Sequence, residues 1–365
     1  MTDASAHSDR TSPAVDSPTT QEAIASYHKR SRRKVVAIAL LALVAVASFL
    51  FTVVVGPIDI SVADVVNAVV HPDQVDAQTR TVIRTLRLPA AVMAVLVGAA
   101  LGLAGAQMQT ILDNPLAEPF TLGISASAAF GAALSIVMGW TLLPNPQLNL
   151  ALTAALSACL AVAIVAGASM WRGANAESMI LLGIALSFFF QAMLSLLQYV
   201  ASTEALQQIV FWTMGSMQRA TWTANIVLAV ALLVAVPFCA VNSWRLTALR
   251  LGDDRAAALG VNVNRLRLTT LLVASLLAAA SVAFTGIIGF IGLVGPHIAR
   301  MLVGEDQKYF LPGAAAAGAL LMSLAYAVSL SVIPGVAIPI GIITSLVGVP
   351  FFVFLIFTRA RRRSA

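Results

Sequence analysis

The acidic residues and lysines of this chain limit the chemistry that it can perform by itself. All sixteen Asp and Glu residues fall in tails, loops or the ends of apolar stretches, so we expect none at mid-depth in the folded protein. Carriers driven by protons or sodium generally mark their path with buried ionisable groups, and this placement therefore favours an energy source supplied from elsewhere. The three lysines, Lys29, Lys34 and Lys308, complete no glycine-rich phosphate-binding loop. ATP hydrolysis, if it is used, must come from a partner.

The histidines and cysteines predict neither an active site nor a metal site. Of the four histidines, His297 alone lies near an apolar stretch, and no Ser–His or Asp–Asp arrangement accompanies it. A single histidine without a second His or Cys nearby is more typical of a packing residue than of a metal ligand. Cys159 and Cys239 are far apart in sequence and are expected to pack as small apolar residues. We expect no enzyme activity and no cofactor or metal in this chain.

The longest polar segment between apolar stretches, residues 242–267, has the pattern of a docking element. Gly252 and Gly260 fit the positions that end helices, and Asp253 fits the N-cap of a second short helix. The pattern predicts two short amphipathic helices, residues 244–251 and 253–259, joined at a Gly–Asp corner to form a rigid knob. The alternative is a simple connector, although 26 residues is longer than an idle connection needs. The residues that we expect in this knob are Leu251, Gly252, Asp253, Asp254, Arg255, Leu259 and Gly260.

Composition indicates that the apolar stretches are membrane spans. The chain is 59% hydrophobic and 10% charged, whereas a soluble domain has roughly 25% charged residues. A spanning helix needs about 20 mostly apolar residues. The sequence predicts an all-α integral membrane protein with about ten spans: Val35–Val55, Leu88–Leu112, Phe120–Trp140, Leu148–Ala168, Met179–Tyr199, Ala224–Val241, Leu268–Phe284, Ile287–Val303, Ala314–Ile333 and Ile338–Phe357.

The basic residues at both ends of the chain predict its orientation. The runs 29–34 and 359–363 are rich in Lys and Arg, and the positive-inside rule puts both termini in the cytoplasm, which requires an even number of crossings. The net charge of +6 then reflects topology and contact with anionic lipids rather than nucleic-acid binding. We expect a disordered basic tail over residues 1–34, a membrane domain over 35–358 with its cytoplasmic loop 242–267, and a second basic tail over 359–365.

Two segments rich in glycine and proline interrupt the apolar pattern. They are Gly105–Gly123 and Gly286–Arg300. Inside a bilayer every backbone N–H and C=O needs a partner, so a broken helix persists only where protein or a water-filled path surrounds it. These breaks favour a conduit over a passive scaffold.

Strings of residues along the whole membrane domain resemble one family of transport proteins, the FecCD permeases of binding-protein-dependent ABC importers. The resemblance covers essentially all of residues 35–358, in the family's order. The matching strings are Arg87–Pro89, Gly98–Gly105 with Gln107–Gln109, Asn114–Pro119, Leu182–Leu186, Trp212–Ser216, Leu251–Val261, Gly289–Arg300, Pro339–Gly341 and Gly348–Phe352.

The resemblance implies a function and a set of partners. A protein of this family is the permease subunit in the cytoplasmic membrane of a bacterium. It pairs with a second permease subunit, sits on two ATPase subunits that use ATP and magnesium, and receives its cargo from a substrate-binding protein outside the membrane. The cargo implied is an iron chelate, most simply a ferric siderophore, with haem and vitamin B12 as alternatives. An ion-coupled carrier and a passive scaffold remain open as other classes.

The resemblance also implies roles for particular positions. The segment Leu251–Val261 is similar to the helices that couple the permease to the ATPase. Asn114 and Leu116 resemble an inner gate, and Glu177 with Ser178 falls where a second inner constriction lies. The outer mouth is implied at Trp212, Gly215 and Ser216.

The binding-protein contact departs from the family's pattern. Family members commonly carry a second arginine where this chain has Ala90, a glutamate where it has Ala337, and an arginine that is missing from residues 325–331. Arg84 and Arg87 remain as candidates for docking an acidic lobe of the binding protein, and we expect both to project from the first turn of the second span.

Overall fold

The protein is a bundle of helices. The computed structural model describes residues 20–56, 60–172 and 176–363, in which the only strand-like pairing is one isolated bridge between Ile333 and Val336. The α-helices are α1 (Thr20–Val54), α2 (Val62–Val70), α3 (Ala77–Thr81), α4 (Leu88–Ile111), α5 (Ile124–Met138), α6 (Pro146–Arg172), α7 (Ala176–Val200), α8 (Thr203–Thr213), α9 (Trp222–Leu249), α10 (Asp253–Ala258), α11 (Val263–Thr285), α12 (Ile291–Val303), α13 (Gln307–Ser331) and α14 (Ile340–Arg363). A π-helical stretch, Val82–Arg87, leads into α4, and short 3₁₀ turns occur at Pro72–Gln74 and Pro119–Leu122.

The helices confirm the predicted all-α membrane architecture. Among the described residues, seven helices are long and apolar enough to cross a membrane: α1, α4 with the turns before it, α6, α7, α9, α11 and α13. Three shorter apolar helices, Ile124–Met138, Ile291–Val303 and Ile340–Phe354, correspond to the other three predicted spans. The division between the seventh and eighth spans is where the sequence puts it, because α11 ends at Thr285 and Gly286 leaves the helix with a φ of +78°.

The prediction of a disordered N-terminal tail is wrong for residues 20–34. These residues form the first turns of α1, in a stretch rich in good helix formers. Ser31 hydrogen-bonds the hydroxyl of Tyr309 on α13, and the Lys34 ammonium lies 5.0 Å from the centre of the same ring. Residues 1–19 lie outside the described part of the chain. At the other end, residues 359–363 continue α14 and do not form a separate tail.

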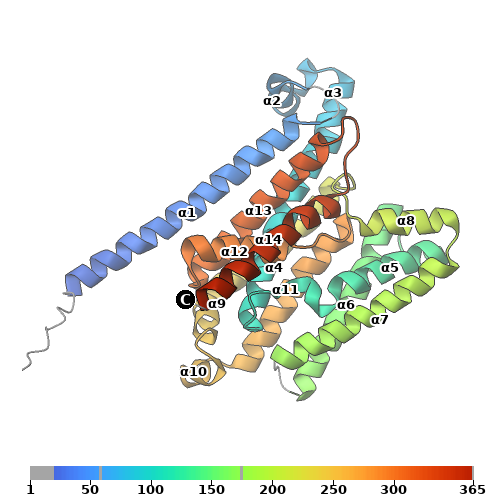
Figure 1. The fold of residues 1–365 in the computed structure, drawn as a ribbon. Helices are drawn as coiled ribbons and strands as arrows, with labels where there is room; N and C mark the ends of the chain where they lie inside the picture. Colours follow the sequence, from blue (N-terminus) through green and yellow to red (C-terminus); the bar gives the residue numbers. More distant parts are fainter. Residues whose placement is uncertain (1–19, 57–59, 173–175, 364–365) are drawn as a thin grey trace, which may run out of the picture.

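Helix α4 is the centre of the bundle. It packs against α13, α11, α12 and α9, and most of its side chains are buried (Figure 1). Helix α1 lies along α13, while α5, α6, α7 and α8 form a second group beside α11. We call the end of the bundle that carries α2 and α3 the α2 end, and the opposite end the α10 end (Figure 1).

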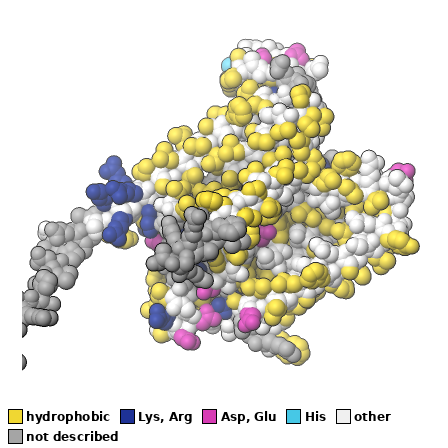
Figure 2. Space-filling view, viewed as in Figure 1, with side chains coloured by type: hydrophobic (Ala, Val, Ile, Leu, Met, Phe, Trp, Pro, Cys, Tyr) yellow, Lys and Arg dark blue, Asp and Glu magenta, His cyan; other side chains and the backbone are white. Residues whose placement is uncertain are grey.

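Hydrophobic and charged side chains are separated on the surface. Figure 2 shows hydrophobic side chains over the sides of the bundle and a concentration of Lys, Arg, Asp and Glu near α10 and at the start of α1. This distribution is expected for helices whose sides face lipid and whose ends face water.

Glycines let α4 approach its neighbours closely, because Gly98, Gly102 and Gly105 are all buried in the helix contacts. A methyl group on Gly318 of α13 would overlap the carbonyl oxygen of Gly98. A methyl group on Gly105 would overlap the carbonyl oxygen of Gly292 on α12. The backbones touch at these points, so no larger side chain fits without moving a helix.

We predict that Gly318→Ala destabilises the protein by about 1–3 kcal/mol, because the added methyl overpacks the α4–α13 contact. Thermal unfolding of the detergent-solubilised protein measures the effect. Gly167→Ala in α6 is the matched control, since no atom lies within 4 Å of the position that its methyl would occupy. That control should be neutral or stabilising, because alanine is the better helix former. Equal melting temperatures for the two variants would contradict the close packing.

Candidate functional site

The corner at α10 is built differently from the predicted pair of short helices. Helix α9 continues unbroken to Leu249, so the expected first helix, residues 244–251, is the end of a spanning helix. No glycine or proline falls between Pro237 and Gly252, and nothing therefore stops α9 earlier. Gly252, with a φ of 98°, makes the corner, and Gly260, with a φ of 83°, follows the end of α10 as predicted.

Asp253 was expected to be the N-cap of the second helix, but Gly252 holds that position. The Asp253 carboxylate instead binds Arg267 of α11. Nη1 and Nη2 of Arg267 donate to its two oxygens at 3.1 and 2.9 Å. The Nε of Arg267 donates to the carbonyl oxygen of Ile111 at 2.8 Å, and the arginine is only 5% exposed. One buried guanidinium thus fastens α10 to the end of α4.

The outer surface of the corner is exposed. Leu251 and Leu259 are 53% and 52% exposed, and Asp254 and Arg255 also face solvent. A short helix held from behind by an ion pair, with leucines on its free side, suits docking into a groove on another protein.

A second set of charges links four elements at the α10 end. Arg250, at the end of α9, donates to Asp113 at 2.9 Å and to Glu305 at 2.7 Å. Arg300 of α12 lies 3.1 Å from Glu305 and donates to the side chain of Gln109 at 2.8 Å. These contacts connect α9, α4 with the loop that follows it, and α12 with the loop that leads to α13.

Two glutamines of α4, Gln107 and Gln109, could either line a path or bond to neighbouring helices. Both bond to neighbours: Gln109 accepts from Arg300 of α12, and Gln107 donates to the sulfur of Cys239 on α9. Both side chains are fully buried in the chain.

The segment Asn114–Pro119 forms a tight turn at the α10 end. The side-chain oxygen of Asn114 accepts the backbone N–H of Leu116 at 2.9 Å, and the Asn114 N–H donates to the carbonyl of Gln109 at 3.1 Å. Asp113 has a φ of +43°, which is uncommon for a residue with a side chain. Leu116 is 42% exposed, so its side chain is free to meet another surface.

Glu118, which the sequence puts in a loop at the end of a span, lies inside the bundle. Its Cβ lies 3.7 Å from where a methyl on Gly292 would be, and Gly292 contacts α4 at Gly105. Gly105 is six residues from the end of α4, which is about 9 Å along a helix. The carboxyl accepts the backbone N–H of Phe290, at the beginning of α12, and its Oε2 atom is buried with no hydrogen-bond partner among the described residues. The turn at Asn114 folds the chain back into the bundle, which sequence position alone does not reveal.

Glu177 and Ser178 lie in the first turn of α7, and both are exposed. Further along α7, Gly183 packs against Thr121 and Leu122, the 3₁₀ turn that follows Glu118. The two candidate gate segments therefore belong to neighbouring elements of the same chain. Among the described residues, no hydrogen bond joins Leu116 and Ser178 directly.

Toward the other end, Trp212–Ser216 joins three elements through backbone hydrogen bonds. The carbonyls of Met214 and Gly215 accept the N–H groups of Gly341 and Ile340 at the start of α14, at 3.0 and 3.1 Å. The N–H of Ser216 donates to the carbonyl of Thr285 at the end of α11, at 2.7 Å. Trp212 is only 3% exposed.

A cavity of about 720 Å³ opens beside this junction. Gly215 and Ser216 line it together with Trp212, and residues of α8 and of the loop before α14 complete it. The three residues expected at an outer mouth therefore lie on one hollow.

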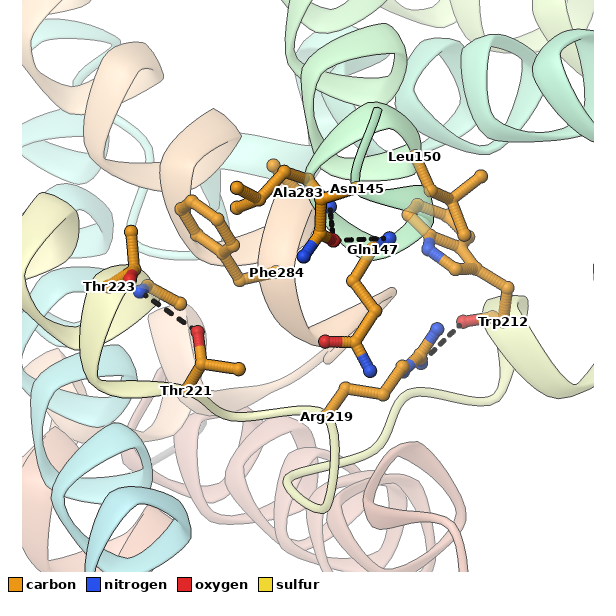
Figure 3. Close-up of a pocket in the computed structure, with 11 residues that line it drawn as sticks. Asn145, Gln147, Leu150, Trp212, Arg219, Thr221, Thr223, Ala283 and Phe284 are labelled. Atoms are coloured by element: carbon orange, nitrogen blue, oxygen red, sulfur yellow. Dashed lines mark hydrogen bonds between the residues drawn. The ribbon is translucent and has the colours of Figure 1, made fainter. Parts of the chain in front are cut away.

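Arg219, which the sequence marks only as one of a few basic residues on that side, lines the same cavity. It also lines a second cavity of about 130 Å³ with Gln147 and Trp212 (Figure 3). Its Nη2 donates to the carbonyls of Trp212 and Thr285 at 3.3 and 3.1 Å. Burial lowers the pKa of Arg219 to about 10, which leaves it charged at neutral pH. A lone arginine in a segment that joins two helices is the only feature of the sequence that could have indicated a functional residue here.

The two candidate docking arginines have different positions. Arg84 is exposed, and its carbonyl accepts the indole N–H of Trp222 at 2.9 Å. Arg87 is only 9% exposed, and its Nη1 donates to the carbonyls of Val53 and Val54 at the end of α1, at 3.2 and 2.7 Å. The expectation that both project from the surface is wrong for Arg87, because the unpaired carbonyls of a helix end attract a cation.

No metal site is found. Within the residues that the structure describes, no group of three or more His, Cys, Asp and Glu could hold a metal ion. His297 packs edge-on against the ring of Phe351 at 5.8 Å.

Comparisons with known proteins agree on one family. The family model described as the FecCD transport family matches residues 42–358. The hemin transport system permease protein HmuU of Yersinia pestis is 38% identical over 280 residues, which cover 76% of this chain and 84% of that protein. The vitamin B12 import system permease protein BtuC of Vibrio vulnificus is 32% identical, covering 90% of this chain and 96% of that protein. A solved structure, the inward-facing conformation of a candidate metal-chelate type ABC transporter, is similar with a TM-score of 0.78 and 34% identity, over 88% of this chain and 98% of that one.

We predict that Arg267→Met loosens α10 without unfolding the bundle. The change removes the fork to Asp253 and leaves that carboxylate without its partner, a local cost of about 2 kcal/mol because the carboxylate is half exposed. Hydrogen exchange of the amides in residues 251–261 should become faster. Arg265→Met, at an exposed position of the same helix, is the control and should leave exchange unchanged. If both variants exchange like the unmodified protein, the ion pair does not hold the corner.

Proposed function

This chain belongs to the FecCD transport family, and we propose that it is the membrane-spanning permease subunit of an ABC importer for a metal chelate. The observation that carries the proposal is the family match along residues 42–358 together with the placement of an exposed docking corner at one end of the bundle and a cavity toward the other. The fold supplies a path and contacts for partners, while the chemical energy comes from another subunit.

The α10 end faces the cytoplasm in this proposal. It carries Arg250, Arg255, Arg265, Arg267, Arg300 and Lys308, and α1 begins on the same side with its basic run. The α2 end carries fewer cations, so the positive-inside rule selects this orientation in the bacterial cytoplasmic membrane.

Three kinds of partner follow from the proposal. An ATPase subunit docks on the α10 corner through Leu251 and Leu259. A second permease subunit, the same chain or a different one, closes the path, and a substrate-binding protein delivers cargo to the α2 end. Exposed leucine, valine and phenylalanine side chains along α7 and α14 are consistent with a permease partner or with lipid.

The path would be closed on the cytoplasmic side by Asn114 and Leu116 and by Glu177 and Ser178. Support for this comes from the exposed side chain of Leu116 on a turn that its neighbours hold rigidly. On the outer side, cargo would enter past Trp212, Gly215 and Ser216.

We propose a ferric siderophore as the cargo, with haem or vitamin B12 as alternatives. The names of two relatives, hemin and vitamin B12 permeases, show that similar chains serve different chelates. Ligand-induced thermal stabilisation of the cognate binding protein, screened over ferric siderophores, haem and cobalamin, identifies the chelate.

One observation favours a second candidate function, an ion-coupled carrier. Glu118 is an acid inside the bundle with one buried, unpartnered oxygen, which is the kind of group that such carriers use. Uptake that continues in vesicles without any ATPase subunit would support the carrier and contradict the importer.

We predict that Leu259→Glu uncouples transport from ATP hydrolysis. The new carboxylate would be buried at the ATPase contact, at a cost on the order of several kcal/mol where no cation neutralises it. Co-purification of the ATPase and cargo-stimulated hydrolysis by the reconstituted transporter should both fall. Asn264→Glu, an exposed position at the start of α11, is the control. Unchanged co-purification and hydrolysis in Leu259→Glu would place the ATPase elsewhere.

We predict that Arg84→Glu slows association with the binding protein. Reversing an exposed charge changes the electrostatic steering of an acidic partner, and the effect should be largest at low salt, where screening is weak. Association rates measured over a salt series should differ between the variant and the unmodified protein at low ionic strength and converge at high ionic strength. Arg84→Gln should give an intermediate rate. Identical rates at low salt would show that Arg84 takes no part in docking.

A further inference from the structure

Arg219 lies in a confined position that its structural contacts only partly explain. Both of its described hydrogen bonds use Nη2, and they run to the carbonyls at the ends of α8 and α11. Those carbonyls fix the guanidinium and offset part of its charge. Its Nε is buried and has no hydrogen-bond partner within the described residues. A buried donor left without an acceptor is costly, so the protein keeps an arginine at this position against an energetic cost.

The surroundings of Arg219 contain amides and apolar groups but no acid. Neither the cavity of about 720 Å³ nor that of about 130 Å³ has an Asp or Glu among its described lining residues, and no ion pair to Arg219 occurs in the described chain. Glu204 lies on α8 but lines neither cavity.

Glutamine side chains gather at the same hollow. Gln207, Gln208 and Gln218 line the larger cavity, and Gln147 lines the smaller one. Figure 3 shows the amide end of Gln147 directed toward Arg219. Asn145 is already committed, because its side-chain oxygen accepts the N–H groups of Gln147 and Leu148 at the start of α6. The free amides add donors around one guanidinium without adding negative charge.

We propose that Arg219 is an anion-recognition residue at the outer mouth, and that it binds a carboxylate or comparable oxyanion of an anionic chelate as cargo enters. The planar guanidinium matches the geometry of a carboxylate, and Arg219 lines both cavities, so a chelate that enters them can reach it. The proposal rests on the importer function above and narrows its cargo to chelates that carry exposed negative charge. The competing explanation is that Arg219 only clips α8 to α11.

Binding of two iron chelates to the purified transporter, without the binding protein, separates these explanations. The probes are ferric citrate, which is anionic, and ferrichrome, which is neutral. The unmodified protein should bind ferric citrate more tightly. Arg219→Met should weaken ferric citrate binding about tenfold or more, the range for one charge-assisted hydrogen bond, and leave ferrichrome unchanged. Arg219→Lys keeps the charge but not the fork, and should fall between.

Arg80→Met is the matched control, because it removes an arginine at the α2 end that lines neither cavity. It should leave the binding of both chelates unchanged. Equal losses for the two chelates in Arg219→Met would show a structural clip and overturn the proposal, as would an unmodified protein with no preference for the anion.

ATP-driven uptake in vesicles keeps this result separate from the broader function. If the unmodified transporter, supplied with its binding protein, takes up none of ferric citrate, ferrichrome, haem and cobalamin with ATP, the importer function fails. If it takes up chelates and Arg219→Met slows ferric citrate and ferrichrome alike, only the anion site fails. A slower association with the binding protein in Arg219→Met, with unchanged chelate binding, would assign the arginine to an acidic protein surface and would also overturn the proposal.

Discussion

The structure depends on satisfying backbone groups where helices break inside the bundle. Residues 286–290 are not helical, and in a membrane their N–H and C=O groups have no water to bind. The protein provides partners from distant segments on the two sides of this break: the carbonyl of Thr285, which ends α11, accepts from Ser216 and Arg219, and the N–H of Phe290 donates to the Glu118 carboxyl. Each break is therefore also a junction, and the junctions bring together the segments to which we assign function.

Helix α4 connects the two kinds of junction. At the α10 end its last carbonyls receive Arg267, which also holds α10, and the turn at Asn114 follows directly. Six residues earlier, Gly105 touches Gly292 at the beginning of α12. Because α4 is buried along most of its length, a displacement of α10 would act first on the end of α4 and on the turn that follows it. The candidate inner gate thus directly follows the helix end that Arg267 ties to the candidate ATPase contact.

Local sequence patterns predicted the features that depend on local chemistry. Apolar length predicted the spans, and Gly286 predicted the break after Thr285. The patterns failed where a distant partner decides the outcome. Arg87 has the sequence context of a surface arginine, but it is buried because it binds the end of α1. Residues 20–34 have the sequence context of a tail, but they contact Tyr309. Asp253 has the right spacing for an N-cap, but Arg267 binds it more strongly than a backbone N–H could. Arg219 has no local motif, because its surroundings come from α6, α8 and α11.

Glu118 shows why a buried acid need not imply ion coupling. The acid lies at the start of α12, where its carboxyl group accepts the backbone N–H of Phe290, one of the N–H groups that the start of a helix leaves without a partner in the helix. Phe290, the N-cap residue of α12, has a φ of 70° and offers no side-chain cap, so the helix takes its capping group from the chain segment that follows the Asn114 turn. A structural carboxyl group of this kind holds that segment against α12, and it would do so in an ATP-driven importer as readily as in a carrier.

The contact between Glu118 and Phe290 also ties the inner turn to the break in the middle of the bundle. Movement of the turn at Asn114 would then displace residues 286–290, which follow directly on Thr285, the residue that Ser216 binds at the outer junction. Glu118, the acid that could suggest a proton path, therefore also has a structural role, because it links the inner turn to the break at residues 286–290.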